Sequence, residues 1–215
     1  MVDRAFIAHG RFANAFSAAY DPDLRRHACG DSAFVAYARC APLRVTVAFF
    51  DPVCAEEAMP HVVDQFIAAF KPKGRVIWWK VSEGVARHLA TRGDYSLAEY
   101  GYENDVRLGD VQRLEGARWR GLRRDLTAAK TAGITVSPIR SGDDQIWQDL
   151  ERVSSKWLAS RARTVEIKRA TRRTPPRPEA HCTKVCAMRN NRVVGWASMD
   201  HIYHRGRLIG GGLSS

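Results

Sequence analysis

A glycine-rich segment near the end of the chain has the spacing of a phosphate-binding loop. Arg207 to Gly212 reads R-L-I-G-G-G and fits the R-x-x-G-x-G pattern of loops that bind acetyl-coenzyme A. Such a loop works because a following helix directs its N-terminal amides and its dipole at the pyrophosphate. Only three residues follow Gly212. We therefore expect a glycine-rich strand end here, and a coenzyme A dependent N-acyltransferase remains an alternative function.

Sulfur and imidazole side chains in the last part of the chain are of the types that bind zinc. Cys182 and Cys186 come first, and His201 and His204 follow them. Both pairs lie in or beside expected strands, a placement more typical of core thiols and surface imidazoles. We therefore predict no metal site. The other histidines have no serine or cysteine nucleophile at a recognisable elbow, so the sequence does not support a hydrolase triad.

Asp51 and two tryptophans are the remaining single residues that could belong to a site. Asp51 precedes Pro52 at the end of an expected strand, where its carboxylate is best explained as a helix cap and could otherwise border a site. Trp119 and Trp157 lie on the apolar faces of expected helices, which favours core positions. Either tryptophan could alternatively border a site and stack on a base.

Positive charge is concentrated in two segments. The chain carries a net charge of +11. Gln112–Lys130 has six basic and two acidic residues, and Lys156–Arg177 has eight basic and one acidic residue. These segments contribute +4 and +7, which together account for the whole excess. This charge distribution predicts a polyanionic partner, which could be a nucleic acid or an anionic membrane surface. A solvated basic surface that only aids solubility is the alternative.

The overall composition is that of a globular protein without a membrane anchor. Of the 215 residues, 45% are hydrophobic, which is enough for a core. No apolar run approaches the roughly 18 to 20 residues that a spanning helix needs. The first fourteen residues lack the pattern of a secretory signal. Five scattered cysteines indicate reduced thiols. We expect a cytoplasmic protein.

These residues must be positioned by alternating strands and helices, a pattern that predicts an α/β layered fold. We expect strands at Ala33–Tyr37, Arg44–Phe50, Arg75–Val81, Leu97–Leu108, Ile134–Pro138, Thr183–Met188 and Val193–Met199. We expect helices at Ala13–Tyr20, Ala55–Phe70, Ser82–Thr91, Gly116–Ala132 and Asp143–Ser160. The pair Asn190-Asn191 between two expected strands predicts a hairpin turn.

The helix expected at Gly116–Ala132 has two distinct faces. The apolar face comprises Trp119, Leu122, Leu126 and Ala129. Arg120, Arg123 and Arg124 cluster on the other face. This pattern predicts a helix that packs on the core and presents its guanidinium groups outward. The prolines and arginines of Thr164–Glu179 predict an extended basic loop that binds an anion.

The order of several short motifs resembles a known family. The motifs are Phe34-Val35-Ala36-Tyr37, Phe50-Asp51-Pro52-Val53, Trp78 to Val81, Tyr100-Gly101-Tyr102-Glu103, Trp119 to Arg124 with its continuation through Lys130 to Gly133-Ile134, Lys156-Trp157-Leu158, and Arg192 to Ala197. In this order they resemble the carboxy-terminal catalytic region of phosphatidylglycerol lysyltransferases and alanyl-phosphatidylglycerol synthases. The resemblance covers Ala28 to Met199.

The resemblance implies two acetyltransferase-like (GNAT-type) lobes in tandem that use no acetyl-coenzyme A and no other cofactor. The first lobe would span residues 1–140 and an incomplete second lobe residues 141–215. The donor would be aminoacyl-tRNA and the acceptor an anionic membrane lipid such as phosphatidylglycerol, reached at the inner membrane face.

The same resemblance implies the binding residues. The side chains that would contact tRNA or lipid phosphate are Arg120, Arg123, Arg124, Lys130, Lys168, Arg169, Arg172 and Arg173. Asp51 and Trp157 are the possible site border. A noncatalytic module that binds RNA or a membrane through its basic helix is the alternative from another functional class.

Overall fold

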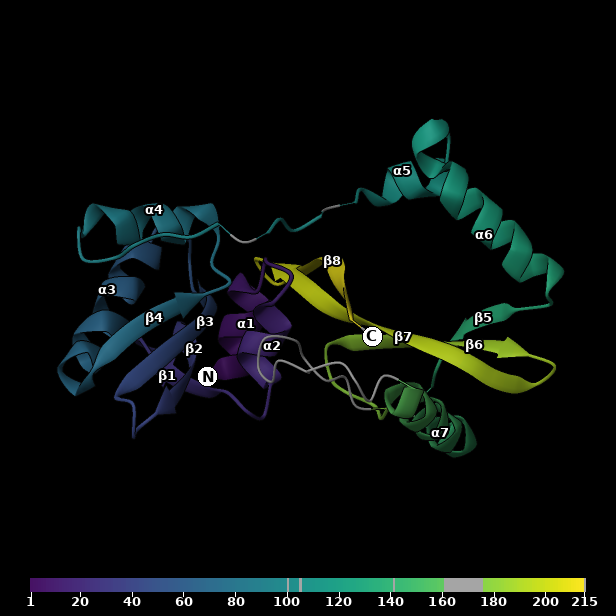
Figure 1. Cartoon of the computed structure of the whole chain (residues 1–215), viewed down its shortest axis with the longest axis horizontal. Helices are drawn as coiled ribbons and strands as arrows, with labels where there is room; N and C mark the ends of the chain where they lie inside the picture. Colours follow the sequence, from purple (N-terminus) through teal and green to yellow (C-terminus); the bar gives the residue numbers. More distant parts are fainter. Residues whose placement is uncertain (100, 105, 141, 161–175, 215) are drawn as a thin grey trace.

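The computed structural model describes residues 1–99, 101–104, 106–140, 142–160 and 176–214. These residues form two four-stranded sheets with helices around them, which confirms the expected mixed α/β class (Figure 1). The first sheet contains β1 (Arg25–Ala28), β2 (Phe34–Cys40), β3 (Val45–Val53) and β4 (Arg75–Trp79) in that order. β1, β2 and β3 pair antiparallel, and β4 joins β3 in parallel.

Helices cover both faces of the first sheet. α3 (Met59–Phe70) connects β3 to β4, as a parallel pair requires, and α4 (Glu83–Thr91) packs beside it. Alternate residues of β2 divide between the two faces, so that Val35 packs against α3 while Phe34 faces α1 (Val2–His9) and α2 (Ala15–Tyr20). Because side chains alternate between the two faces of a strand, the first sheet has an apolar surface on each face, and both surfaces are buried.

The second sheet contains β5 (Thr135–Pro138), β6 (Cys182–Arg189), β7 (Arg192–His204) and β8 (Arg207–Ser214), all antiparallel. The turn between β6 and β7 is formed by Asn190 and Asn191, whose φ angles are +51° and +56°. Positive φ at both central residues matches the twist of a two-residue hairpin, and asparagine tolerates that conformation. The predicted hairpin is confirmed.

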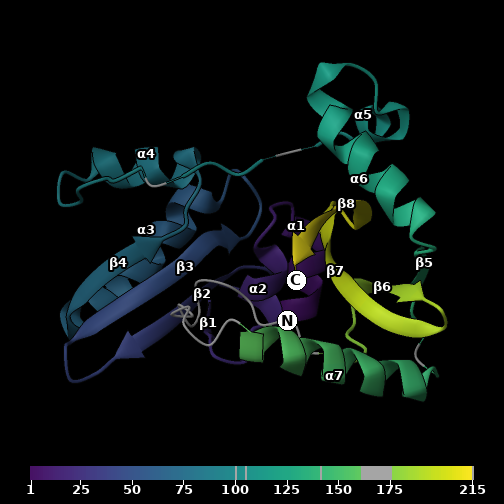
Figure 2. The same ribbon diagram turned by 45° about the vertical axis from the view of Figure 1, so that its right-hand side comes forward.

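α7 (Asp144–Ser160) packs on one face of this second sheet around Leu150, Cys186 and Val193. In two views turned by 45°, α7 lies on one side of the sheet and α6 (Arg120–Thr131) on the other (Figures 1 and 2). The chain's first two helices join the two sheets. Phe6 of α1 packs against Tyr203 of β7, and the backbone amide of Tyr203 donates to the carbonyl of Gly10 over 2.9 Å.

Two expectations about the middle of the chain are wrong. The described residues between Leu97 and Arg107 form neither strand nor helix, and α5 (Leu108–Arg113) follows them. The segment contains Leu97, Tyr102 and Val106, which are residue types common in strands. No strand of the described residues pairs with it, however, and a strand without a partner has no hydrogen bonds for its backbone.

The second error concerns the burial of the basic helix. It forms as η2 (Ala117–Trp119) and α6, but none of the twelve residues of α6 is buried. Leu122 is 39% exposed and Leu126 is 42% exposed. The helical period was therefore read correctly, whereas the packing inferred from it does not occur in the described structure.

The division of the chain at residue 140 stays a prediction, as does the tandem acetyltransferase-like architecture. β5 precedes that position and pairs with β6 in the second sheet, with Pro138 opposite Val185. The helix α6 and the loop before it connect the two sheets (Figure 1).

Candidate functional site

A bulge in β3 marks the first candidate site. Ala36 pairs with Phe49 and Phe34 pairs with Val53, so four steps along β3 oppose two steps along β2. Within the bulge Phe50 has φ +66°, an unusual conformation for a bulky residue. Bulges and strained backbone occur often beside active sites, where they redirect a side chain. Here the redirected side chain is Asp51.

Asp51 connects the bulge to the start of α4. Its Oδ1 accepts a hydrogen bond from the backbone amide of Ser82 over 2.7 Å, and Ser82 is the residue that caps α4. A carboxylate at this end of a helix is stabilised by the unpaired amides and the helix dipole. Asp51 thus caps a helix 31 residues further along the chain, whereas the sequence suggested a cap for the next helix.

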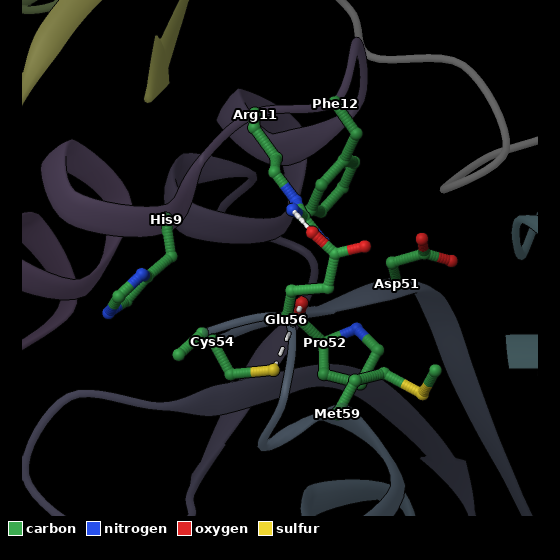
Figure 3. A pocket seen from close by; sticks show the side chains of 9 residues that line it. His9, Arg11, Phe12, Asp51, Pro52, Cys54, Glu56 and Met59 are labelled. Carbon is green, nitrogen blue, oxygen red and sulfur yellow. Dashed lines mark hydrogen bonds and ion pairs between the residues drawn. The ribbon is translucent and has the colours of Figure 1, made fainter. Parts of the chain in front are cut away.

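A small pocket adjoins Asp51 (Figure 3). Its other lining residues are His9, Arg11, Phe12, Pro52, Cys54, Ala55, Glu56 and Met59. Arg11 Nη1 pairs with Glu56 Oε2 and ties the segment between α1 and α2 to the segment between β3 and α3. The pocket is small and open to solvent, and it lies beside Asp51.

The electrostatics of this pocket exclude a thiol nucleophile at neutral pH. Burial raises the pKa of Cys54 to about 12, so the thiol stays protonated. Burial also lowers the pKa of His9, with nearby Arg11 acting in the same direction. The hydrogen bond from Arg11 lowers the pKa of Glu56. The pocket thus offers the ionised carboxylate of Glu56 and the neutral imidazole of His9.

The second candidate site is the exposed helix α6. Arg120, Arg123, Arg124 and Lys130 are all exposed on it. Arg123 Nη1 donates to the carbonyl oxygens of Leu114 and Gly116, the latter over 2.9 Å, and so fixes the turn before the helix. Arg124 makes an exposed ion pair with Asp125 at 3.2 Å. Exposed pairs of this kind contribute little to stability, so the guanidinium of Arg124 is available to an anionic partner.

The structure does not bring the predicted site residues into one place. β3, which holds Asp51, and α6 lie far apart in both views (Figures 1 and 2). Trp157 lies on α7 and is 48% exposed, so the expectation of a core position was wrong. Lys168, Arg169, Arg172 and Arg173 lie outside the described residues. The sequence missed Arg11 and Glu56 because no local pattern joins residues 45 positions apart.

The two patterns that suggested a coenzyme or zinc site are parts of the second sheet. Gly210, Gly211 and Gly212 lie in β8 and pair with β7, which confirms the expected glycine-rich strand. Cys182 pairs in register with Asp200, so its side chain lies on the face opposite to that of His201. Among the described residues, no group of three or more His, Cys, Asp and Glu side chains is arranged to hold a metal ion.

The helices in the described part of the chain are each too short or too polar to cross a membrane.

Comparisons with known proteins identify what this chain is similar to. Residues 6–209 match the family described as phosphatidylglycerol lysyltransferase, C-terminal. No curated protein matches the chain.

Two solved structures share the fold. One is the C-terminal domain of a protein described as a lysylphosphatidylglycerol synthetase from Agrobacterium fabrum, at 19% identity and a TM-score of 0.68. The other is L-PGS from Bacillus licheniformis, at 16% identity and a TM-score of 0.73. The alignments cover 100% and 99% of this chain but only 68% and 64% of those chains.

Proposed function

Since this chain belongs to the phosphatidylglycerol lysyltransferase C-terminal family, we propose that it transfers an aminoacyl group from aminoacyl-tRNA to a lipid hydroxyl such as that of phosphatidylglycerol. The observation that carries the donor assignment is the exposed basic helix α6, all of whose cations are free of burial. Phosphates of a tRNA backbone are neutralised by such cations with release of counterions.

Arg120, Arg123, Arg124 and Lys130 contact the donor in this proposal. An RNA helix presents phosphates and ribose hydroxyls, which a rigid array of guanidinium groups can bind without reading sequence. The cluster Lys168, Arg169, Arg172 and Arg173 adds affinity for the tRNA backbone or for anionic lipid phosphate. The acceptor is reached by peripheral contact at the inner membrane face.

The chemistry needs no cofactor and no covalent enzyme intermediate. An aminoacyl ester of tRNA is already activated, so transfer depends on positioning the two substrates, on accepting the hydroxyl proton and on stabilising the oxyanion. The protonated state of Cys54 agrees with direct transfer. Asp51 and Trp157 border the substrates in this proposal, Asp51 through its carboxylate and Trp157 through its exposed ring.

The test measures binding and transfer in one set of proteins. The unaltered chain and the variant Arg120→Ala/Arg123→Ala/Arg124→Ala are incubated with radiolabelled aminoacyl-tRNA and phosphatidylglycerol vesicles, and the extracted lipid is counted. The matched control is Arg25→Ala/Arg39→Ala/Arg87→Ala, which removes three exposed arginines from the first sheet and α4.

We expect labelled lipid from the unaltered chain and the control, and loss of label in the α6 variant. The affinity for tRNA decreases as salt concentration rises, and this dependence should be weaker in the α6 variant. The magnitude of the slope of log affinity against log salt concentration should decrease by about 2 to 3, because each lost phosphate contact reduces it by roughly 0.7 to 0.9. Binding of tRNA without labelled lipid from the unaltered chain would instead identify a noncatalytic RNA-binding module. Equal losses in the two variants would show that only total charge matters.

A further inference from the structure

Four polar side chains where β6 begins and β7 ends form a continuous hydrogen-bonded chain. Thr183 Oγ1 lies 2.8 Å from His201 Nε2. His201 Nδ1 lies 3.2 Å from the hydroxyl of Tyr203. The same hydroxyl lies 3.0 Å from His181 Nδ1. Both histidines therefore form a hydrogen bond with the Tyr203 hydroxyl through a ring nitrogen, and His201 also forms one with the Thr183 hydroxyl.

The donors and acceptors of this chain can be assigned in two consistent ways. In the first, Thr183 donates to His201, and His201 donates to Tyr203 through Nδ1–H. Tyr203 then donates to His181. In the second, every donor and acceptor is exchanged, because a neutral imidazole carries one N–H and one bare nitrogen. A change from one arrangement to the other moves protons along the whole chain, which is the property of a proton relay.

Packing fixes the geometry of the relay. The Tyr203 ring meets Phe6 edge to face at 5.4 Å, and the His181 ring stacks on Tyr20 at 5.9 Å with planes 23° apart. The backbone amide of His201 donates to the carbonyl of His181 over 2.9 Å. Rings held on two sides in this way keep their nitrogen positions, which a proton transfer requires.

The outer end of the relay lies on the open face of the second sheet. Lys184 and Cys186 approach Trp147 and Leu150 on the α7 side, so Thr183 between its neighbours in β6 points away from α7. α6 lies on that same side (Figures 1 and 2). Met199, opposite Thr183 in the register, is 43% exposed there. The relay thus opens beside apolar surface on the side of the basic helix.

We propose that the chain Thr183–His201–Tyr203–His181 is the general base of the acyl transfer, with an amphiphilic acceptor on the open face of the second sheet placing its hydroxyl at Thr183 and His201. This assignment rests on the proposed function above. His201 is the catalytic residue because it receives the proton. Tyr203 and His181 are positioning residues that hold its tautomer, as the orienting partner of a catalytic histidine does in other acyl transferases and hydrolases.

The step balances without a further reactant. The acceptor O–H bond breaks as its oxygen bonds to the ester carbonyl carbon, and the proton passes to His201 Nε2 by way of the Thr183 hydroxyl. The tetrahedral intermediate then collapses, and the bond from the carbonyl carbon to the ribose oxygen breaks. His201 returns the proton to that ribose oxygen. Burial, with His181 nearby, lowers the pKa of His201, so the imidazole is neutral and able to accept the proton at neutral pH.

The test compares His201→Gln, His201→Ala and Tyr203→Phe with the control His61→Gln, an exposed histidine of α3. Single-turnover transfer of label to phosphatidylglycerol and the dissociation constant for aminoacyl-tRNA are measured for each. We expect transfer to fall about 100-fold in His201→Gln and about 10-fold in Tyr203→Phe, since a positioned base contributes on the order of 10²- to 10⁴-fold. The tRNA dissociation constant should stay within twofold, and added imidazole should restore part of the rate of His201→Ala.

The outcomes separate the relay from the proposed function. Transfer by the unaltered chain that persists within threefold in His201→Gln overturns the relay and leaves the transferase intact. Loss of transfer in His201→Ala without rescue by imidazole, together with full activity of Tyr203→Phe, shows a structural role and also overturns the relay. Absence of transfer by the unaltered chain overturns the proposed function, and the catalytic role of the relay with it.

Discussion

The two sheets of this protein differ in how they are covered. The first sheet is packed on both faces, by α1 and α2 on one side and by α3 and α4 on the other, and most of the buried hydrophobic residues belong to it. In the second sheet, Cys186 and Val193 form a small buried cluster with Leu150 of α7, and Leu213 on β8 is 81% exposed. Stability is therefore concentrated in the first sheet, whereas the exposed basic helix α6 and the hydrogen-bonded chain of Thr183, His201, Tyr203 and His181 lie on and around the second sheet.

The contrast has a physical consequence for how the molecule opens. Segments with few buried apolar contacts unfold locally at lower free energy than segments in a core. α6 is such a segment because it has no buried residue. A helix of twelve residues is marginal in water on its own, so binding of a polyanion would stabilise it. Substitutions in the two regions should therefore differ in size and in the measurement that detects them.

The largest expected effect is in the first core. Phe66 is fully buried and packs against Phe70 at 4.6 Å and Trp78 at 5.5 Å between ring centroids. Phe66→Ala should lower the free energy of unfolding by about 3 to 5 kcal/mol, because it removes a large apolar side chain and leaves a cavity. Urea denaturation followed by circular dichroism measures this. Leu126→Ala on α6 is the control and should change it by less than about 1 kcal/mol; equal losses would contradict the contrast.

An intermediate effect is expected in the second sheet at Lys184. Its side chain is 2% exposed, and Nζ lies 2.7 Å from Glu179 Oε2 and 5.8 Å from the centre of the Trp196 ring. Lys184→Met should destabilise the protein by about 1 to 3 kcal/mol, because Glu179 loses a charged partner. Amide hydrogen exchange measures this effect, and the amides of β6 and β7 should lose protection before those of the first sheet in the variant.

The double variant Lys184→Met/Glu179→Gln separates charge from packing. If the cost of Lys184→Met comes from the loss of the ion pair with Glu179, the neutral double variant should recover part of it. A double variant less stable than Lys184→Met would show that the apolar environment of the lysine stem matters more than the ion pair.

The smallest effect is expected in α6. A Cβ at Gly121 would meet no atom within 4 Å, so Gly121→Ala should stabilise this helix by about 1 kcal/mol through propensity alone. The gain should appear as slower hydrogen exchange of α6 amides, with the free energy of global unfolding unchanged. Gly133→Ala is the matched control, because Gly133 has φ +71° and alanine there is strained, which should speed the same exchange. A rise in global stability for Gly121→Ala would show that α6 is coupled to the cores.

Much of the secondary structure could be predicted because it depends on local patterns. The strand β4, the helices α3, α4 and α7 and the hairpin at Asn190-Asn191 were all predicted within a few residues. The strand expected at Leu97–Leu108 does not form, because residue type alone does not supply a neighbouring strand to pair with. The apolar face of α6 was also read correctly, yet periodicity cannot say whether another element covers it.

The candidate sites were harder to predict for the same reason. The basic residues of α6 could be found from charge clustering along the chain. The pocket beside Asp51 could not, because the bulge in β3 and the Arg11–Glu56 ion pair depend on strand pairing and on the packing of α1 and α2. His181, His201 and Tyr203 are separated along β6 and β7, and only the hairpin register and the contact of Tyr203 with Phe6 bring their polar atoms together.

The sequence by itself determined which segments form helices and strands, where positive charge accumulates, and the family that the motifs resemble, since periodicity, turn residues and charge act over a few neighbouring positions. Only the tertiary structure decided that the first sheet is buried on both faces while much of the second sheet is exposed, that α6 is exposed, and that a threonine, two histidines and a tyrosine form one hydrogen-bonded chain. Those outcomes depend on strand pairing and side-chain packing between residues distant in sequence, which no local pattern encodes.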